Sequence, residues 1–325
     1  PDPRRIDRRE LLRLGAATGA GLVVGTATFP GCATSATPPS SPTTTEAMPT
    51  RNLGRTGHKV AIFSLGGESA LDKPDNHDVA IPIIERAIDL GVNYLDTAPW
   101  YGRPERWSQR YIGEVMKSRR DEVYLATKTH DRTYDGSMRL LEESLELLQT
   151  DHIDAWQLHR LSYPKDNDEV FAKDGAMKAL IEAREQGVVR NLGITGHTDP
   201  DVLMEAMRRF NFDQILMAFN AADPHHLSFT AELLPMAVEQ EMGIIGMKVC
   251  ARGRILDKIT MREAMNYVLS YPVSTVVVGC ESIAQLEENI ELGRTFTPIS
   301  ERQMADLHER TESIASRSLW FRRDA

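Results

Sequence analysis

Four side chains, at the ends of three predicted strands and in the loop after one of them, are the residues that could carry chemistry. Asp96 and Tyr101 lie five residues apart in a loop bounded by proline and glycine, and Lys128 and His159 each end a later apolar segment. Carboxylate, phenol, ammonium and imidazole groups exchange protons with a reacting molecule when they are held close to it. The loop therefore resembles an active-site edge. The alternative is that Asp96 caps the next turn and Tyr101 is an ordinary loop aromatic.

Lys128 needs a partner if its strand is buried. An ammonium group at the end of the apolar segment 123–128 is costly to bury unless a counter-ion pairs with it, and Asp96 is the obvious candidate. A lone histidine on an apolar strand is usually a core residue. His159, however, ends its strand at the same level as Lys128, which favours a role at a shared site.

The repeat of short apolar segments and amphipathic helices predicts how these residues are positioned. From residue 50 onward, Val-, Ile- and Leu-rich segments end near residues 65, 96, 128, 159, 194, 218, 248 and 279. Each interval fits one strand and one crossover helix. Eight such units favour an α/β fold, the (β/α)8 TIM barrel, in which the carboxyl ends of the strands meet at one mouth.

Apolar residues at three- and four-residue spacing predict the helices 81–90, 107–117, 138–148, 176–186, 202–210, 233–242, 261–269 and 283–292. Glycine turns within 51–60 predict an N-terminal β-hairpin that plugs the bottom of the barrel. An extra C-terminal helix is predicted over 300–314. We expect the aromatic residues of the tail 319–323 to pack on the outside of the barrel.

These residues resemble the aldo-keto reductase family over about residues 50–300. The motifs are Asp-Thr-Ala-x-x-Tyr-Gly from Asp96 to Gly102, the strand-end Lys128, and Asp-x-x-x-x-His from Asp154 to His159. The resemblance implies NAD(P)H-dependent interconversion of a carbonyl compound and its alcohol, without a metal. It makes Tyr101 the proton donor, with Lys128 lowering the phenol pKa. Asp96 would hold Lys128, and His159 would orient the carbonyl.

The resemblance also implies a cofactor site for NADP(H) or NAD(H). The loop after the seventh strand would meet the diphosphate, and the segment 279–289 would take the adenosine. The alternative for 279–289 is a capped helix with an exposed acidic face. Because neutral Gly279 and Gln285 replace basic residues, the choice between the two cofactors stays open. The residues implied are Gly66, Thr195, Gln214, Lys248, Arg252, Gly253, Cys280, Gln285, Glu288 and Asn289.

Charge and cysteine content exclude other classes of function. The formal net charge of −9 argues against a nucleic-acid partner, which requires a basic face. The three cysteines, Cys32, Cys250 and Cys280, lack metal-ligand spacing and form no disulfide framework. A metal-dependent hydrolase lacks a ligand cluster, since His225 and His226 are adjacent. The remaining alternative to an enzyme is a cofactor-binding redox-sensing or regulatory module of the same fold with little turnover.

The N-terminal residues predict export. Arg8-Arg9 precedes a weakly apolar run over 14–29, so residues 1–33 resemble a twin-arginine signal recognised by the twin-arginine export machinery. Residues 34–49 form a Pro/Ser/Thr linker that we expect to be disordered, and 50–325 form the barrel domain. Cys32 is a possible lipid anchor. We expect a periplasmic protein, or one anchored on the outer side of the inner membrane.

Overall fold

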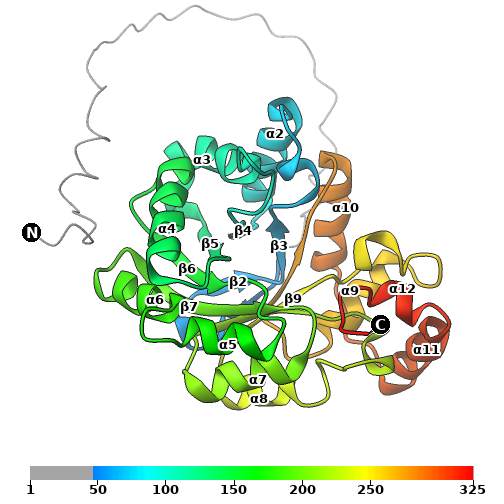
Figure 1. The fold of residues 1–325 in the computed structure, drawn as a ribbon. Helices are drawn as coiled ribbons and strands as arrows, with labels where there is room; N and C mark the ends of the chain where they lie inside the picture. Colours follow the sequence, from blue (N-terminus) through cyan, green and yellow to red (C-terminus); the bar gives the residue numbers. More distant parts are fainter. Residues whose placement is uncertain (1–46, 325) are drawn as a thin grey trace, which may run out of the picture. The chain divides into compact units, whose positions relative to one another are not determined.

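The computed structural model describes residues 47–324, and its centre is a closed barrel of eight parallel strands. Figure 1 shows the strands forming a ring with the helices outside it. The predicted signal over 1–33, with Cys32, and residues 34–46 of the predicted linker 34–49 lie outside the described residues. The strands are β3 Phe63–Gly66, β4 Tyr94–Asp96, β5 Tyr124–Thr129, β6 Ile153–Leu158, β7 Val189–Gly196, β8 Gln214–Ala218, β9 Gly243–Met247 and β10 Thr275–Val278.

Each strand pairs with the next strand in the chain, and β10 pairs with β3 to close the barrel. The predicted (β/α)8 fold is therefore confirmed. The strands read as continuous apolar runs because they are buried on both faces, against the barrel interior and against the helices. This register places the end of β3 beside the end of β4, where Gly66 pairs with Asp96.

The crossover helices follow the predicted apolar periodicity. They are α2 His77–Asp89, α3 Trp107–Arg119, α4 Tyr134–Leu148, α6 Ala176–Glu185, α7 Pro200–Arg209, α8 Leu233–Glu239, α9 Met261–Leu269 and α10 Ile283–Arg294. A short helix, α5 Pro164–Val170, lies in the loop after β6. In α4 the buried positions Leu141, Leu145 and Leu148 recur at three- and four-residue spacing, as expected for a helix that packs one face on the barrel.

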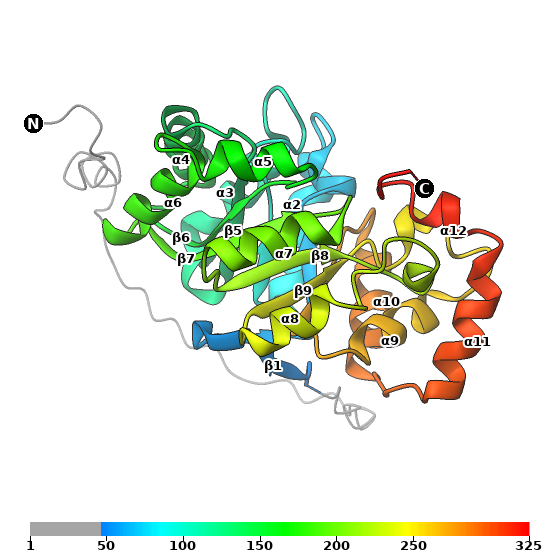
Figure 2. The same cartoon turned by 60° about the horizontal axis from the view of Figure 1, so that its bottom comes forward.

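The predicted hairpin at the bottom of the barrel is present. The strand β1 Thr50–Asn52 pairs antiparallel with β2 Lys59–Ala61, and Figure 2 shows this hairpin beneath the barrel strands. Leu53 and Val60 from the hairpin are fully buried in the same apolar cluster as Ile245 from β9. The hairpin therefore closes the amino end of the barrel, and the opposite end stays available for chemistry.

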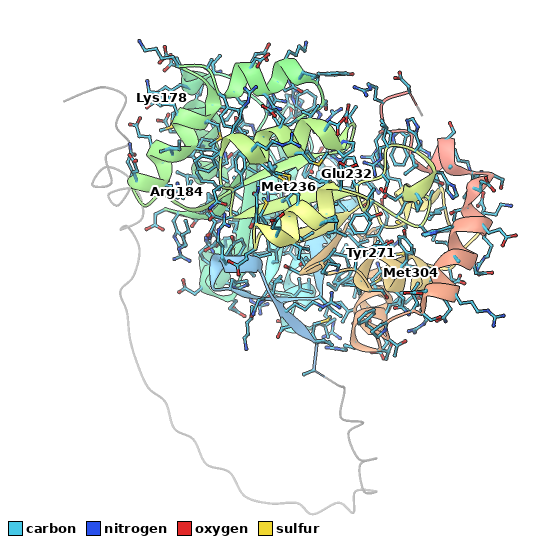
Figure 3. All side chains as sticks on the ribbon, turned by 90° about the horizontal axis from the view of Figure 1, so that it is seen from below. Lys178, Arg184, Glu232, Met236, Tyr271 and Met304 are labelled. Atoms are coloured by element: carbon cyan, nitrogen blue, oxygen red, sulfur yellow. The ribbon has the colours of Figure 1, made fainter. Side chains whose placement is uncertain are left out.

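The C-terminal residues form the helices α11 Glu301–Glu312 and α12 Ala315–Ser318, so the predicted extra helix is also confirmed. Tyr267 on α9 ties α11 to the barrel wall, since its hydroxyl lies 3.0 Å from His308 Nε2 and 3.1 Å from the Tyr271 hydroxyl. Figure 3 labels Tyr271 beside Met304 on α11. Within residues 47–324, no helix combines the length and apolar character that a membrane span requires.

Candidate active site

The four residues singled out in the sequence converge at the carboxyl end of the barrel. Asp96 is the last residue of β4, Lys128 lies near the end of β5, and His159 directly follows β6. Tyr101 lies in the loop after β4, with its ring edge-on to the His159 ring at 6.1 Å between centroids. These strands are neighbours in the barrel, so their ends present four different groups to one small volume.

Lys128 and Asp96 form a buried ion pair. The Lys128 Nζ donates to Asp96 Oδ2 at 2.7 Å and to the Thr97 carbonyl oxygen at 2.8 Å, and both side chains are at most 3% exposed. Burial lowers the pKa of Lys128, and Asp96 opposes that change. The predicted pairing is thus present, and it fixes the ammonium group beneath the Tyr101 loop.

Tyr101 lies above this ammonium group. The Lys128 Nζ is 5.0 Å from the centroid of the Tyr101 ring. Burial raises the pKa of Tyr101 well above its ordinary value, and the charge of Asp96 raises it further. In this structure burial therefore outweighs the predicted lowering of this pKa by the nearby Lys128. Lys128 directs its hydrogen bonds to Asp96 and Thr97, and the Asp96 carboxylate offsets its charge, so the phenol is protonated at neutral pH.

His159 is a buried neutral imidazole at the same end of the barrel. It is 4% exposed, and burial lowers its pKa well below the ordinary value, with the charge of Lys128 as the next cause. Its backbone N–H donates to the Thr129 carbonyl oxygen at 2.8 Å, while its Nδ1 is buried without a hydrogen-bond partner in the structure. A neutral imidazole in this position can hydrogen-bond a substrate oxygen without carrying charge.

A second group of charges crosses the barrel mouth near β10. Glu68, in the loop after β3, accepts from Lys248 Nζ at 3.0 Å and from the Arg252 guanidinium, which both follow β9. Burial would raise the pKa of Glu68, but the two cations overcome this effect and lower the pKa. The backbone of both Lys248 and Arg252 is left-handed, with φ of 60° and 52°. This loop therefore gathers two cations around one carboxylate.

Two residues predicted to contact the cofactor make hydrogen bonds with other residues of the barrel. Gln214 begins β8, is fully buried, and exchanges hydrogen bonds with the Tyr124 and Tyr94 hydroxyls at 3.0 and 3.2 Å. Its amide is therefore engaged inside the barrel, and its contact with a cofactor stays a prediction. Thr195 on β7 is also fully buried, and its Oγ1 accepts from the backbone N–H of Arg160 at 2.9 Å. Thr195 therefore supports the loop that follows His159.

The segment 279–289 is divided between buried and exposed residues. Cys280 is fully buried, and its Sγ accepts from the Asn289 amide at 3.6 Å. Burial raises the pKa of this thiol to about 12. Asn289 is 4% exposed, whereas Gln285 and Glu288 are exposed on α10. Among residues 47–324, no group of three or more His, Cys, Asp or Glu side chains could hold a metal ion.

The C-terminal tail reaches the barrel mouth, so its expected position outside the barrel is wrong. Arg322 donates to the carbonyl oxygens of His197, which follows β7, and Ala218, which ends β8, at 2.9 and 2.7 Å. Phe321 packs on the core cluster that contains Met247. No periodicity or motif in the tail predicts this return, because the tail is held by contacts with residues about 100 positions earlier in the chain.

The sequence matches the model of the Aldo/keto reductase family over residues 63–266. The uncharacterized oxidoreductase YqkF of Bacillus subtilis is 27% identical over 293 residues, which cover 75% of this chain and 90% of that protein. The L-galactose dehydrogenase of Arabidopsis thaliana is 25% identical over 285 residues, which cover 74% of this chain and 86% of that protein.

Comparison with solved structures also finds an aldo-keto reductase. The apo form of aldo-keto reductase AKR11C1 from Bacillus halodurans matches with a TM-score of 0.64 and 26% identity, over 81% of this chain and 96% of that one. The holo form of the same enzyme has a TM-score of 0.69. With a family match over more than half of its length, this chain belongs to the aldo/keto reductase family.

Proposed function

We propose that this protein is an NAD(P)H-dependent oxidoreductase that interconverts an aldehyde or ketone and its alcohol. The observation that carries the proposal is the meeting of Tyr101, Lys128 and His159 at one end of the barrel. Family membership supports an oxidoreductase. The alternative, a sensing module of the same fold, would not need a protonated phenol beside a buried ion pair.

The proposed residues divide the reaction into proton donation and positioning. A bound nicotinamide dinucleotide would supply the hydride. As the carbonyl carbon accepts the hydride, the C=O π electrons move to oxygen, and the Tyr101 hydroxyl donates the proton that completes the alcohol. His159, held neutral by burial, hydrogen-bonds the carbonyl oxygen and orients it. Lys128 stabilises the tyrosinate left behind, and Asp96 keeps Lys128 in place.

The residues after β9 fit the diphosphate of such a cofactor. Lys248 and Arg252 supply two positive charges, and the backbone at Gly253 is open, with no atom within 4 Å of where a Cβ would stand. Cationic side chains form charge-assisted hydrogen bonds with phosphate oxygens, and the open space at Gly253 leaves room for a phosphate group to approach the backbone. Gln285 and Glu288 are the exposed candidates for the adenosine end. The proposal covers both NADPH and NADH.

A Tyr101→Phe variant tests the proposal. Carbonyl reduction over a panel of aldehydes and ketones should fall at least about 100-fold, the scale of a lost general acid, while nucleotide binding followed by fluorescence is retained. Tyr271→Phe is the control, because Tyr271 lies in the loop between α9 and β10, beside the N-terminal hairpin. Unchanged turnover in Tyr101→Phe would show that Tyr101 is not the proton donor. Nucleotide binding by the wild type without turnover of any carbonyl compound would favour the sensing module.

We also propose that the protein is exported through the twin-arginine pathway. The Arg8-Arg9 pair and the weakly apolar run behind it support this proposal. Replacing both arginines with lysine should retain the protein in the cytoplasm, as measured by fractionation and immunoblotting. Export of the double variant at the wild-type level would contradict the proposal. Mass spectrometry of the exported form would give its processed start and any lipid on Cys32.

A further inference from the structure

A cavity of about 250 Å³ opens beside His159, and it is distinct from the Lys248 loop. We call it the side pocket. It is lined by residues from the loops after β4, β5 and β6, including the exposed aromatic side chains of Trp100 and Tyr163, which are 45% and 51% exposed. Its charged or ionisable lining residues are His130, Arg132, His159, Arg160, Lys165 and Asp166. The pocket adjoins the proposed reaction site through the shared His159.

Asp166 is the acidic residue in this lining, and both of its carboxylate oxygens already have partners within the protein. Its Oδ2 accepts from the backbone N–H groups of Ser162 and Tyr163 at 2.7 and 2.9 Å. Its Oδ1 lies 3.5 Å from Arg132 Nε, so Arg132 balances its charge. The Asp166 carboxylate therefore stabilises the loop and one arginine, and it leaves the other cations of the pocket uncompensated.

Arg160 and Lys165 are the uncompensated cations. Both are exposed, and neither makes an ion pair or a side-chain hydrogen bond with any residue in the described part of the chain. Two unpaired positive charges in one concave site contrast with a chain whose net charge is −9. A cleft lined by charges of one sign concentrates ligands of the opposite sign.

The backbone that carries Arg160 is firmly held. The Arg132 guanidinium donates to the carbonyl oxygens of His159 and Arg160 at 2.9 and 3.0 Å. The Arg160 backbone N–H donates to Thr195 Oγ1, and its φ of 55° is left-handed. Because these three hydrogen bonds fix the backbone, the Arg160 side chain starts from a fixed Cα position. This reduces the conformational entropy that is lost when the side chain binds a ligand.

Arg103, which is not itself a lining residue, places a further positive charge beside Trp100. The Trp100 ring meets the His130 ring edge-on at 4.9 Å, and the Arg103 guanidinium lies 4.1 Å from the centroid of Trp100. Burial lowers the pKa of His130, and the charges of Arg103 and other arginines lower it further. The pocket thus combines an apolar face with a positive potential, which suits a short carbon chain that ends in an anion.

We propose that the side pocket binds a terminal carboxylate or phosphate of the substrate, so that the preferred substrates are small anionic carbonyl compounds. This inference rests on the proposed function. The carbonyl group would lie at His159 and Tyr101, and the anionic end would lie at Arg160 and Lys165. Guanidinium and ammonium groups both form charge-assisted hydrogen bonds with these oxyanions.

Matched substrate pairs test this proposal. The full chain is assayed with 4-oxobutanoate against butanal, and with glyceraldehyde 3-phosphate against glyceraldehyde. We expect kcat/KM to favour at least one anionic member by about tenfold or more, the scale of one charge-assisted hydrogen bond, and the preference to fall as salt is added. The first pair reports on carboxylates and the second on phosphates. Equal kcat/KM within both pairs would overturn the proposal.

Substitutions at Arg160 and Lys165 test whether the preference for anionic substrates arises in the side pocket. Arg160→Gln and Lys165→Gln should each reduce the preference for the anionic member about tenfold, mainly through KM, whereas Arg160→Lys should restore part of it. Arg302→Gln on α11 is the control, because Arg302 is exposed and remote from the mouth. A preference that is unchanged in Arg160→Gln and Lys165→Gln would overturn the assignment to this pocket.

A binding measurement separates this proposal from the proposed function. Succinate and inorganic phosphate are titrated while the fluorescence of Trp100 is followed, with Trp100→Phe identifying its signal. Saturable binding that is lost in Arg160→Gln would establish the anion site even if the protein reduced no carbonyl compound. Absence of binding, in a protein that reduces neutral carbonyl compounds, would overturn the anion site and leave the proposed function intact.

Discussion

Lys128 Nζ lies 2.7 Å from Asp96 Oδ2, and the two side chains are 1% and 3% exposed. The pair is thus shielded from water, and neither partner can lose the other without leaving a buried charge. Burial of an ion pair costs free energy that only good geometry and further hydrogen bonds offset. The additional bond from Lys128 to the Thr97 carbonyl oxygen supplies part of that compensation.

Breaking this pair should lower both the stability and the activity of the protein, and a second substitution should restore the stability alone. Asp96→Asn should lower the free energy of unfolding by about 3–5 kcal/mol, because Lys128 is left charged in the interior. The double variant Asp96→Asn/Lys128→Met should regain most of that stability and remain inactive. Urea unfolding and carbonyl reduction measure the two effects. Lys178→Met, which breaks an exposed pair with Asp174, should cost at most about 1 kcal/mol. Equal losses in Asp96→Asn and Lys178→Met would contradict this prediction.

Two histidines with lowered pKa values, the buried His159 and the half-buried His197, should make stability fall in mild acid. Burial lowers the pKa of His159 and of His197 well below 6.5. As the pH falls below 6.5, both histidines become protonated in the unfolded chain, whereas in the folded chain they stay neutral. The stabilisation is full above that pH and is lost below it, at up to about 1.4 kcal/mol per pH unit for each histidine.

The His197→Gln variant tests this dependence. The change in urea midpoint between pH 7.5 and pH 5.5 should be smaller in His197→Gln than in the wild type, whatever the absolute stability of the variant. His77→Gln is the control, because the His77 side chain is 46% exposed. An identical change in His197→Gln and the wild type would show that His197 does not contribute.

Glu68 should compete with a dinucleotide for Lys248 and Arg252. In the structure both cations bind the Glu68 carboxylate, at the place where we propose that a diphosphate binds. Glu68→Gln removes the competing charge, so the dissociation constant of NADPH or NADH should fall about five- to tenfold, measured by fluorescence titration. Glu301→Gln on α11 should leave it unchanged. Weaker binding in Glu68→Gln would mean that Glu68 instead closes over the cofactor.

The sequence predicted the positions of Asp96, Lys128 and His159 because barrel topology places every strand end at the same mouth. It could not predict which side chains along a strand turn inward. The spacing of Gln214 in its strand does not show which way its side chain points, and the two tyrosines that bind it come from β4 and β5. Only the assembled barrel shows that its amide is already in use.

Contacts between distant loops were also missed. Glu68 and Lys248 are 180 residues apart in the chain, and in the two loops that bring them together Ser69 and Ala251 have left-handed backbone conformations that serine and alanine rarely adopt. The tail was misplaced for a related reason. Arg322 has no periodic apolar pattern around it, and its partner Asp223 is 99 residues away in the chain. Such pairs are specified by tertiary packing and not by local sequence.

Arg322 should anchor the tail at the barrel mouth. Its side chain and that of Asp223 are both 0% exposed, with 2.5 Å between Nη2 and Oδ1, and burial lowers the Arg322 pKa to about 10. The Phe229 ring covers the guanidinium, with 3.5 Å between the ring centroid and Arg322 Cζ. Arg322→Met leaves the Asp223 carboxylate buried without a cation, so the free energy of unfolding should fall by about 3–5 kcal/mol.

The neighbouring residue provides a matched control for this prediction. Arg323 also pairs with an aspartate, Asp199, but its side chain is 43% exposed, so Arg323→Met should cost at most about 1 kcal/mol. Limited proteolysis should release the tail after Leu319 much faster in Arg322→Met than in Arg323→Met, since only the first frees the tail from Ala218 and His197. Arg322→Met/Asp223→Asn should recover stability but keep the fast cleavage, because the carbonyl oxygens still lack their donor. Equal cleavage rates in the two single variants would show that packing of Phe321, and not the buried ion pair, holds the tail.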